Sequence, residues 1–267
     1  MLKYFDSNYW ISEDHPLLNL HRHSDDEIKK EIKIISNHLQ DNNISELIIT
    51  NKLSYGYDWD VGNNKLMESK LIDRIENLHY CYVLTPDAWY TYDFNQYLGK
   101  AFKDGVRLFR LFPRRQLFYI NDYYMKNIYK VLSEKKFPIM LDLKELDITG
   151  NKYFDIDVLE HILEENEDMP LILETTLKQC MFNRYYFPLL ERYNNIYLEI
   201  SGMYLIDQIE GIVDKYGSER LIFGTNYPNL PAEVNNVRMA LSELNIMDKE
   251  NIAFNNFNGI MGRIEIG

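Results

Sequence analysis

Short runs of β-branched and aromatic residues alternate with longer amphipathic stretches along the whole chain. Runs of this kind predict strands, and the amphipathic stretches between them predict helices. The predicted strands are residues 3–7, 46–51, 79–86, 106–113, 138–143, 170–176, 195–202 and 220–228. A regular alternation of strand and helix is typical of βα units built around a parallel sheet.

The stretches between the predicted strands carry signals for helix ends. Ser24-Asp25-Asp26-Glu27 is a capping box at the start of a helix that reaches about Gln40, and Gly105 suits a helix C-terminus. The other predicted helices are residues 64–78, 94–105, 121–137, 154–169, 182–194, 204–217 and 231–244, before a closing segment, 247–262. About eight strand–helix pairs close a barrel. We therefore predict an α/β fold, a single (β/α)8 TIM barrel, forming one domain over residues 1–267 because no linker divides the chain.

Composition and charge narrow the class of partner. The 267 residues include 29 Lys and Arg against 41 Asp and Glu, and the net charge of −12 disfavours nucleic acid and anionic membranes as partners. The two cysteines, Cys81 and Cys180, match no metal or redox spacing, and no cleavable leader or long apolar span appears. We expect a reduced, soluble, cytoplasmic protein, with formation of a homo-oligomer left open.

The clearest motif runs from Asn195 toward the end of the chain. It contains NIYLEISG, then DKYGSERLIFGTNYP, then NIAFNNFNGIMG. This order resembles the C-terminal third of the amidohydrolase-related (amidohydrolase 2) TIM-barrel family, which contains metal-dependent hydrolases and decarboxylases. The runs GVRLFRLFP and FPIMLDL are similar to the fourth and fifth strands of the family, and FDSNYWI is similar to the first. The resemblance covers nearly the whole chain and implies the same barrel.

The resemblance also implies where a metal ion would bind, and those positions have changed. In the family the first strand ends in Asp-x-His-x-His, where this chain has Asn8 and Trp10. The histidines of the fifth and sixth strands correspond to Asp142 and Thr175, and the aspartate of the eighth to Asn226. An indole N–H has no lone pair to give, and amide and hydroxyl oxygens are weak ligands for zinc-like ions. We therefore predict no transition metal and no other cofactor.

Two other metal sites are weaker alternatives. The loop after the first strand contains three histidines, His15, His21 and His23, but a loop lacks the fixed side-chain direction that a strand gives. Magnesium or calcium would accept oxygen ligands from a set of strand carboxylates, namely Asp6, Asp142, Glu174 and Glu199. Strand alternation sends Glu174 and Thr175 to opposite faces of the strand. Because the alignment places Thr175 at the mouth, Glu174 is expected to face away from it, which disfavours this set of carboxylates.

In such barrels a ligand lies at the carboxyl ends of the strands, where the strand–helix loops converge. The residues expected there are Asp6, Asn8, Trp10, Arg110, Asp142, Thr175, Ser201 and Asn226. This hydrogen-bonding, partly charged set predicts a site for a small polar or anionic molecule. Arg110 is a candidate partner for a ligand carboxylate, and Asp142 is either the ion-pair partner of Arg110 or a catalytic acid–base group. The ion pair is favoured because buried carboxylates are seldom unpaired.

Two early loops, residues 54–60 and 87–94, are rich in tyrosine and tryptophan. Aromatic rings over a barrel mouth stack on sugars or planar ligands, or they pack on each other or on a partner subunit. The second arrangement is favoured, because tyrosine is abundant throughout the chain, at 21 residues.

Two functions from different classes follow from this reading. The first is a metal-independent hydrolase of a lactone, amide or ester that uses Asp142 as acid or base. The aspartate that usually serves as the base on the eighth strand is Asn226 here, and an amide takes up no proton at neutral pH. The alternative is a non-catalytic pseudo-enzyme that senses a ligand or takes part in assembly. Fold alone does not decide between them.

Overall fold

The computed structural model describes residues 2–11, 25–56, 58–146, 156–175, 183–205 and 207–266. Five residues discussed above lie outside these ranges: His15, His21, His23, the predicted cap Ser24, and Cys180. Within the ranges, no helix has both the length and the apolar character needed to cross a membrane.

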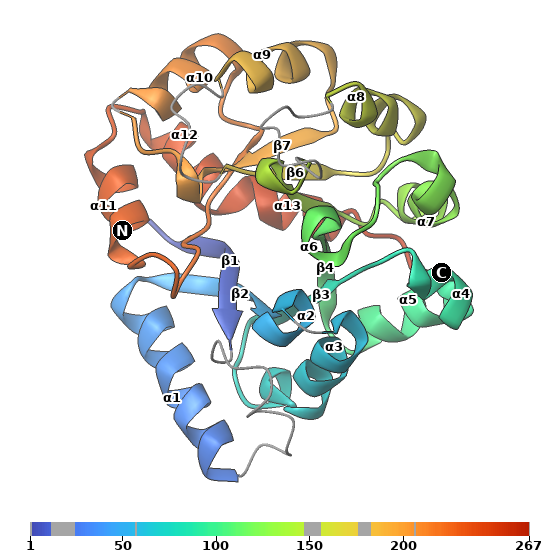
Figure 1. The fold of residues 1–267 in the computed structure, drawn as a ribbon. Coiled ribbons are helices and arrows are strands. Elements are labelled where there is room, and N and C mark those ends of the chain that lie inside the picture. The colour runs from blue at the N-terminus through green and yellow to red at the C-terminus, as the bar shows by residue number, and fades with distance from the viewer. Residues whose placement is uncertain are drawn as a thin grey trace.

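Eight parallel strands form one sheet that curls into a barrel (Figure 1). The strands are β1 (Tyr4–Ile11), β2 (Ile44–Asn51), β3 (Leu78–Val83), β4 (Val106–Leu111), β5 (Ile139–Asp142), β6 (Leu171–Glu174), β7 (Ile196–Glu199) and β8 (Leu221–Ile222). Each strand pairs with the next, and β1 meets the segment after β8, where the Trp10 amide donates to the Tyr227 carbonyl at 2.8 Å. The predicted α/β barrel is therefore confirmed.

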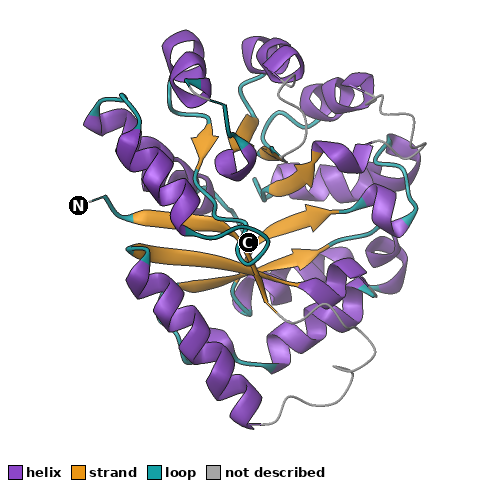
Figure 2. Cartoon of the chain, turned by 60° about the vertical axis from the view of Figure 1, so that its left-hand side comes forward, coloured by secondary structure: helices purple, strands orange, loops and turns teal. Residues whose placement is uncertain are grey.

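Helices surround the strands, as Figure 2 shows. The longer ones are α1 (Asp25–Asp41), α3 (Trp59–Glu68), α5 (Phe94–Lys103), α7 (Asp122–Glu134), α8 (Ile156–Glu165), α9 (Asn183–Arg192), α10 (Gln208–Tyr216) and α11 (Glu233–Leu241). The shorter ones are α2 (Lys52–Gly56), α4 (Asp87–Thr91), α6 (Pro113–Gln116), α12 (Ile246–Glu250) and α13 (Asn256–Gly262). Three 3-10 turns and one π-helical turn complete the described elements: η1 (Leu71–Asp73), η2 (Leu143–Leu146), η3 (Ile200–Gly202) and η4 (Asn251–Asn255).

The helix predicted over residues 64–78 differs from the structure at both ends. α3 begins earlier, at Trp59, because the Asp58 side chain accepts hydrogen bonds from two amides of the first turn and caps the helix. It ends at Glu68, and Lys70 follows with a left-handed φ of 49°. The apolar residues after Lys70 are buried by way of the short turn η1, so the amphipathic pattern continues after the helix has ended.

One apolar side chain from each strand fills a layer inside the barrel. The layer consists of Phe5, Ile48, Cys81, Leu108, Met140, Ile172, Tyr197 and Ile222, and residues of α13 pack against it. Because strand side chains alternate, residues two positions further along face the same interior, closer to the mouth. On four successive strands these residues are Arg110, Asp142, Glu174 and Glu199. A polar layer therefore lies next to the apolar layer, on the side of the mouth.

A β-bulge adjusts the first strand to this arrangement. Asp6 pairs with Leu47 and Tyr9 pairs with Ile49, so β1 has one extra residue between the two pairs. As a result, Phe5 joins the apolar layer while Asn8 contacts the polar layer, although strict alternation would send them to opposite faces. The bulge thus brings the Asn8 amide into the centre of the barrel.

We expect Gly224→Ala to destabilise the protein. A Cβ at residue 224, just after β8, would lie 2.4 Å from Glu199 Oε1 and 2.9 Å from Asn8 Cβ. Neither neighbour can move easily, because Glu199 Oε1 accepts a hydrogen bond from the Ser201 amide at 2.7 Å and Asn8 Cβ is fixed to the backbone of β1. Overpacking of this kind costs about 1–3 kcal/mol.

Gly99→Ala is the matched control for this substitution. Gly99 lies inside α5, and a Cβ there would meet nothing within 4 Å. The control should be neutral or stabilise the protein by about 0.5–1 kcal/mol, because alanine is the better helix former. Urea unfolding of both variants measures the difference, and equal stabilities would contradict the packing argument.

Candidate functional site

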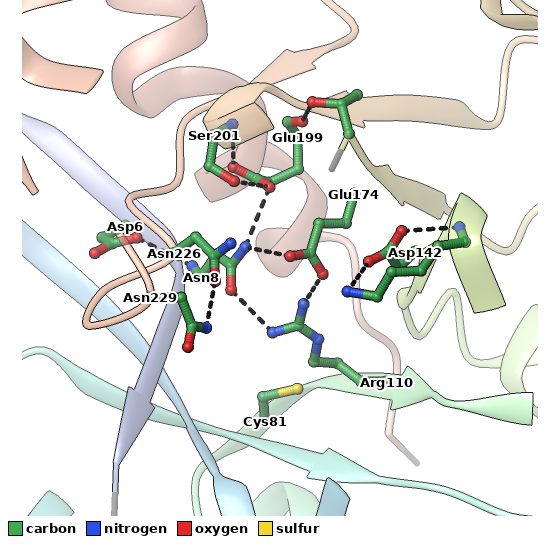
Figure 3. Close-up of polar contacts among 12 residues, drawn as sticks. Asp6, Asn8, Cys81, Arg110, Asp142, Glu174, Glu199, Ser201, Asn226 and Asn229 are labelled. Atoms are coloured by element: carbon green, nitrogen blue, oxygen red, sulfur yellow. Dashed lines mark hydrogen bonds and ion pairs between the residues drawn. The ribbon is translucent and has the colours of Figure 1, made fainter. Parts of the chain in front are cut away.

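Arg110, on β4, lies at the centre of the polar layer (Figure 3). Its side chain is only 1% exposed, yet it is fully engaged. One guanidinium nitrogen, Nη1, donates to Asn8 Oδ1 at 2.9 Å, and Nη2 forms an ion pair with Glu174 of β6. The guanidinium carbon also lies 4.5 Å from the centre of the Trp10 ring, a cation–π contact. Arg110 is thus a permanent buried cation.

Asn8 joins the two sides of this layer. Its amide oxygen accepts from Arg110, while its amide nitrogen donates to Glu174 Oε1 at 3.1 Å and to Glu199 Oε2 at 3.2 Å. A histidine at this position would carry one hydrogen-bonding group on each of two ring nitrogens. The Asn8 amide instead serves three partners at once, because it combines an acceptor with two donors.

Glu199, at the end of β7, is completely buried. Besides Asn8, it accepts hydrogen bonds from the amide and the hydroxyl of Ser201, each at 2.7 Å. Burial and the neighbouring carboxylate of Glu174 raise the pKa of Glu199 to about 8. Glu199 therefore takes the neutral, protonated form more readily than an ordinary glutamate, next to the ion pair of Glu174 with Arg110.

Asp142 ends β5 and pairs with Lys144, not with Arg110. Its Oδ1 accepts from the Lys144 amide at 2.9 Å, and its Oδ2 lies 2.7 Å from Lys144 Nζ. The Lys144 side chain is 53% exposed. Burial opposes its charge, but Asp142 and Glu174 outweigh this and raise the Lys144 pKa, so the ammonium persists. The expected pairing of Asp142 with Arg110 was wrong, because Glu174 reaches Arg110 from β6, across the interior of the barrel, and Asp142 on the intervening β5 pairs with Lys144.

Thr175 and Glu174 take the opposite roles from those that we expected. Asp142, Glu174 and Glu199 occupy the same register on β5, β6 and β7, so their side chains face the same interior. The Thr175 hydroxyl instead donates to the Glu199 carbonyl at 2.7 Å and ties β6 to β7. The prediction placed Thr175 at the mouth because it followed the aligned histidine and not the strand register.

Asp6 and Asn226 lie beside the centre, where both are engaged in local bonds. The fully buried Asp6 carboxylate accepts from the Thr225 hydroxyl at 2.6 Å and contacts His38 Nε2 of α1 at 3.0 Å, which ties β1 to two neighbours. Asn226 has a left-handed φ of 53°, and its side-chain oxygen accepts from Asn229 at 2.9 Å. Ligand binding by Asp6, Asn8, Trp10, Arg110, Thr175 and Asn226 remains a prediction.

The aromatic residues of the two early loops pack on each other and on the centre. Tyr55 lies edge-on to Phe112, with ring centres 4.7 Å apart, and to Trp10 at 5.9 Å. Trp59 contacts Tyr92 of the second loop at 6.3 Å. These contacts agree with the expectation that the loops pack together. The rings that lie over the guanidinium of Arg110 are those of Trp10 and Phe112, on which Tyr55 packs.

A metal ion of the family type does not fit this set of residues. The Arg110 guanidinium already provides a positive charge to Asn8 and Glu174, and it would repel a second cation. Asn8 and Trp10 offer an amide oxygen and an indole N–H in place of two imidazoles. Among the residues that the structure describes, no three His, Cys, Asp or Glu side chains are arranged to hold a metal ion.

Sequence reasoning missed Lys144 as a member of the centre, and it considered Glu174 and Glu199 only as disfavoured ligands of magnesium or calcium. A usable signal was present, because three strands end in the same short pattern: IMLD, LILE and IYLE. Aligning these tetrapeptides places their acidic residues in one register, as the structure does. Lys144 follows Asp142 by two residues, and only the geometry of turn η2 brings its ammonium back to that carboxylate.

Comparison with known proteins locates this barrel among solved structures. No family model and no curated protein matches the sequence. An uncharacterised TIM-barrel protein from Bordetella bronchiseptica is 14% identical, with a TM-score of 0.73 over 98% of this chain and 99% of that one. An amidohydrolase II structure is 14% identical, with a TM-score of 0.71 over 97% and 100%. The 2,6-dihydroxybenzoate decarboxylase from Rhizobium is 13% identical, with a TM-score of 0.65 over 98% and 99%.

The chain has the fold of the amidohydrolase-type TIM barrels. The resemblance noted in the sequence is therefore confirmed at the level of the fold. Identities of 13–14% support the architecture and leave the activity to be argued from the site.

We expect Arg110→Met to cost about 3–5 kcal/mol, because it leaves the Glu174 carboxylate buried without its cation. The double variant Arg110→Met/Glu174→Met should recover much of that loss, since both buried charges are then gone. Arg107→Met on the same strand is the control. Arg107 is only partly buried and donates to backbone carbonyls, so its loss should cost about 1 kcal/mol. Equal costs for the two single variants, by chemical denaturation, would contradict a central role of the ion pair.

Proposed function

We propose that this protein is a divergent member of the amidohydrolase-related family that binds a small polar or anionic molecule at the C-terminal mouth of the barrel, beside Lys144 and Asp142. The proposal rests on one observation, the difference in exposure between the two cationic side chains, Arg110 and Lys144. Arg110 is buried and bonded to Asn8 and Glu174, whereas the Lys144 side chain is 53% exposed.

The chemistry of Lys144 supports an anionic or polar ligand. An ammonium has three N–H donors, and the Asp142 carboxylate takes one of them. The remaining donors are suited to a carboxylate or hydroxyl oxygen of a ligand. The ion pair with the buried carboxylate of Asp142 holds the Lys144 ammonium in one position, whereas an unpaired surface lysine samples many rotamers.

Hydrolysis without a metal is the chemistry that we propose at this site. Asp142 is positioned as a base that activates water toward a lactone, amide or ester, while Lys144 binds the oxygen on which negative charge develops. The alternative, a non-catalytic barrel that only binds, is favoured by the buried Arg110 network, in which Arg110 and the Asn8 amide are already engaged by neighbouring side chains.

Binding is tested first, with Lys144→Met. A panel of small carboxylates, sugar acids and lactones is screened by thermal shift, and each hit is measured by calorimetry. We expect the variant to lose about 10–100-fold in affinity for an anionic hit, the equivalent of one charge-assisted hydrogen bond. Lys126→Met is the control, because Lys126 also faces a carboxylate, at 3.6 Å from Asp122, but lies on the outer helix α7. Equal affinities for both variants would refute the site.

Catalysis is tested with Asp142→Asn. The amide retains an acceptor for the Lys144 backbone N–H, and the partly exposed ammonium returns to water, so we expect a stability loss of only about 1 kcal/mol. Any turnover of a lactone, amide or ester by the parent should fall at least 100-fold, as expected for loss of a general base. A parent that binds the ligand through Lys144 but turns over none of these compounds would support the non-catalytic alternative.

A further inference from the structure

Helix α11 presents apolar side chains on two opposite sides. Met239 lies on the inner side and is fully buried in the main hydrophobic core. Val234, Val237 and Leu241 recur at the spacing i, i+3 and i+7, and all three are exposed, Leu241 by 78%. With about 3.6 residues per turn, this spacing places them along one side of the helix, opposite Met239. The stripe therefore faces away from the barrel, and α11 itself lies on the outside of the molecule (Figure 1).

The apolar surface continues onto α12. Ile246 and Met247, the first residues of that helix, are 64% and 69% exposed. Lys249, later in α12, donates from Nζ to the Ala240 carbonyl at 3.2 Å, so the two helices meet at the end of α11. We call this surface the α11–α12 face, and it consists of Val234, Val237, Leu241, Ile246 and Met247.

The preceding helix, α10, presents a different surface to solvent. Its exposed residues are Gly211, Asp214 and Lys215. A mainly polar surface of that kind is ordinary, whereas large apolar side chains gathered on one side of a molecule mark a site of interaction. The α11–α12 face therefore has the character of a contact surface.

Opposite charges lie at the two ends of α11. Glu233 is exposed in the first turn, and the Lys249 ammonium is held at the last turn by the Ala240 carbonyl. Val237 is midway between Glu233 and Leu241. A two-fold axis at Val237 therefore reverses α11 in one copy relative to the other and brings each Glu233 toward the partner's Lys249. The face is thus self-complementary in charge as well as apolar.

We propose that the α11–α12 face is where two copies of this chain associate, with their α11 helices antiparallel about a two-fold axis at Val237. The net charge of −12 makes two copies repel each other in most orientations, and this arrangement pairs unlike charges at the rim of an apolar contact. The five side chains of the face bury less than the ~800 Å² per partner of a standard interface, so the dimer is reversible, with a Kd of about 1–100 µM.

Sedimentation velocity of the full chain, from about 1 to about 300 µM, tests the association. The parent should change from one chain to two over this range. Val237→Glu should weaken the dimer by about 30-fold or more, because it removes the central apolar contact and places two carboxylates against each other at the axis. Tyr123→Glu is the matched control, since Tyr123 is 84% exposed on α7, and it should change the Kd by less than about twofold.

Two results of this experiment would overturn the proposal. The first is a parent that stays monomeric at every concentration, which would leave the face to a different partner. The second is a dimer that Val237→Glu leaves intact and Tyr123→Glu dissociates, because the contact would then lie on α7.

A charge exchange tests the pairing without changing the apolar residues, and it also covers the case in which Val237→Glu fails to fold. Glu233→Lys and Lys249→Glu should each weaken the dimer about three- to tenfold, because like charges then meet across the axis. The double variant Glu233→Lys/Lys249→Glu should return the Kd to within about twofold of the parent, since each exchanged residue meets its exchanged counterpart in the partner. A double variant as weak as the two single changes combined would overturn the antiparallel arrangement.

Discussion

A guanidinium group sealed inside a barrel keeps its charge, and it must therefore find all its partners within the protein. Arg110 meets this constraint with Glu174, with the oxygen of Asn8, and with the ring of Trp10 against its face. Two of these partners, Asn8 and Trp10, occupy positions to which the sequence resemblance assigns imidazoles. In this protein those positions surround a cation that belongs to the chain itself, and Tyr55 and Phe112 pack against the Trp10 ring that lies on it.

The remaining polar groups follow from that one pair. Once Glu174 is committed to Arg110, the Asn8 amide has donors left for both carboxyl groups, and Glu199 lies next to a fixed negative charge without a cation of its own. Burial first, and then the neighbouring Glu174, raise the pKa of Glu199. Asp142, one strand away in the same register, is excluded from Arg110 and is paired by Lys144 from turn η2. The ion pair of Asp142 with the exposed Lys144 therefore lies at the edge of the centre, where we propose that a ligand binds.

The same barrel architecture is compatible with different sets of residues at its mouth. Solved structures of amidohydrolase-type barrels superpose over nearly the whole chain, while the residues at the mouth form an internal ion-pair and hydrogen-bond network. Strand order and the apolar layer of the interior depend on side-chain volume and alternation, which many sequences satisfy. The polar layer depends on individual donors and acceptors, so a few substitutions change what it can do.

The sequence by itself determined the architecture of this protein. Alternating apolar runs and amphipathic stretches were enough to predict eight strands, because burial against both faces of a parallel sheet leaves a local signature. Pairings within the centre were decided only by the tertiary structure. Arg110 meets Glu174, 64 residues away, because strand register and a bulge in β1 determine which side chains share the interior, and the apolar pattern of a single strand specifies neither. Aligning Thr175 with a family histidine drew attention away from Glu174, whereas the repeated endings IMLD, LILE and IYLE carried the register in which the three acidic side chains face the interior.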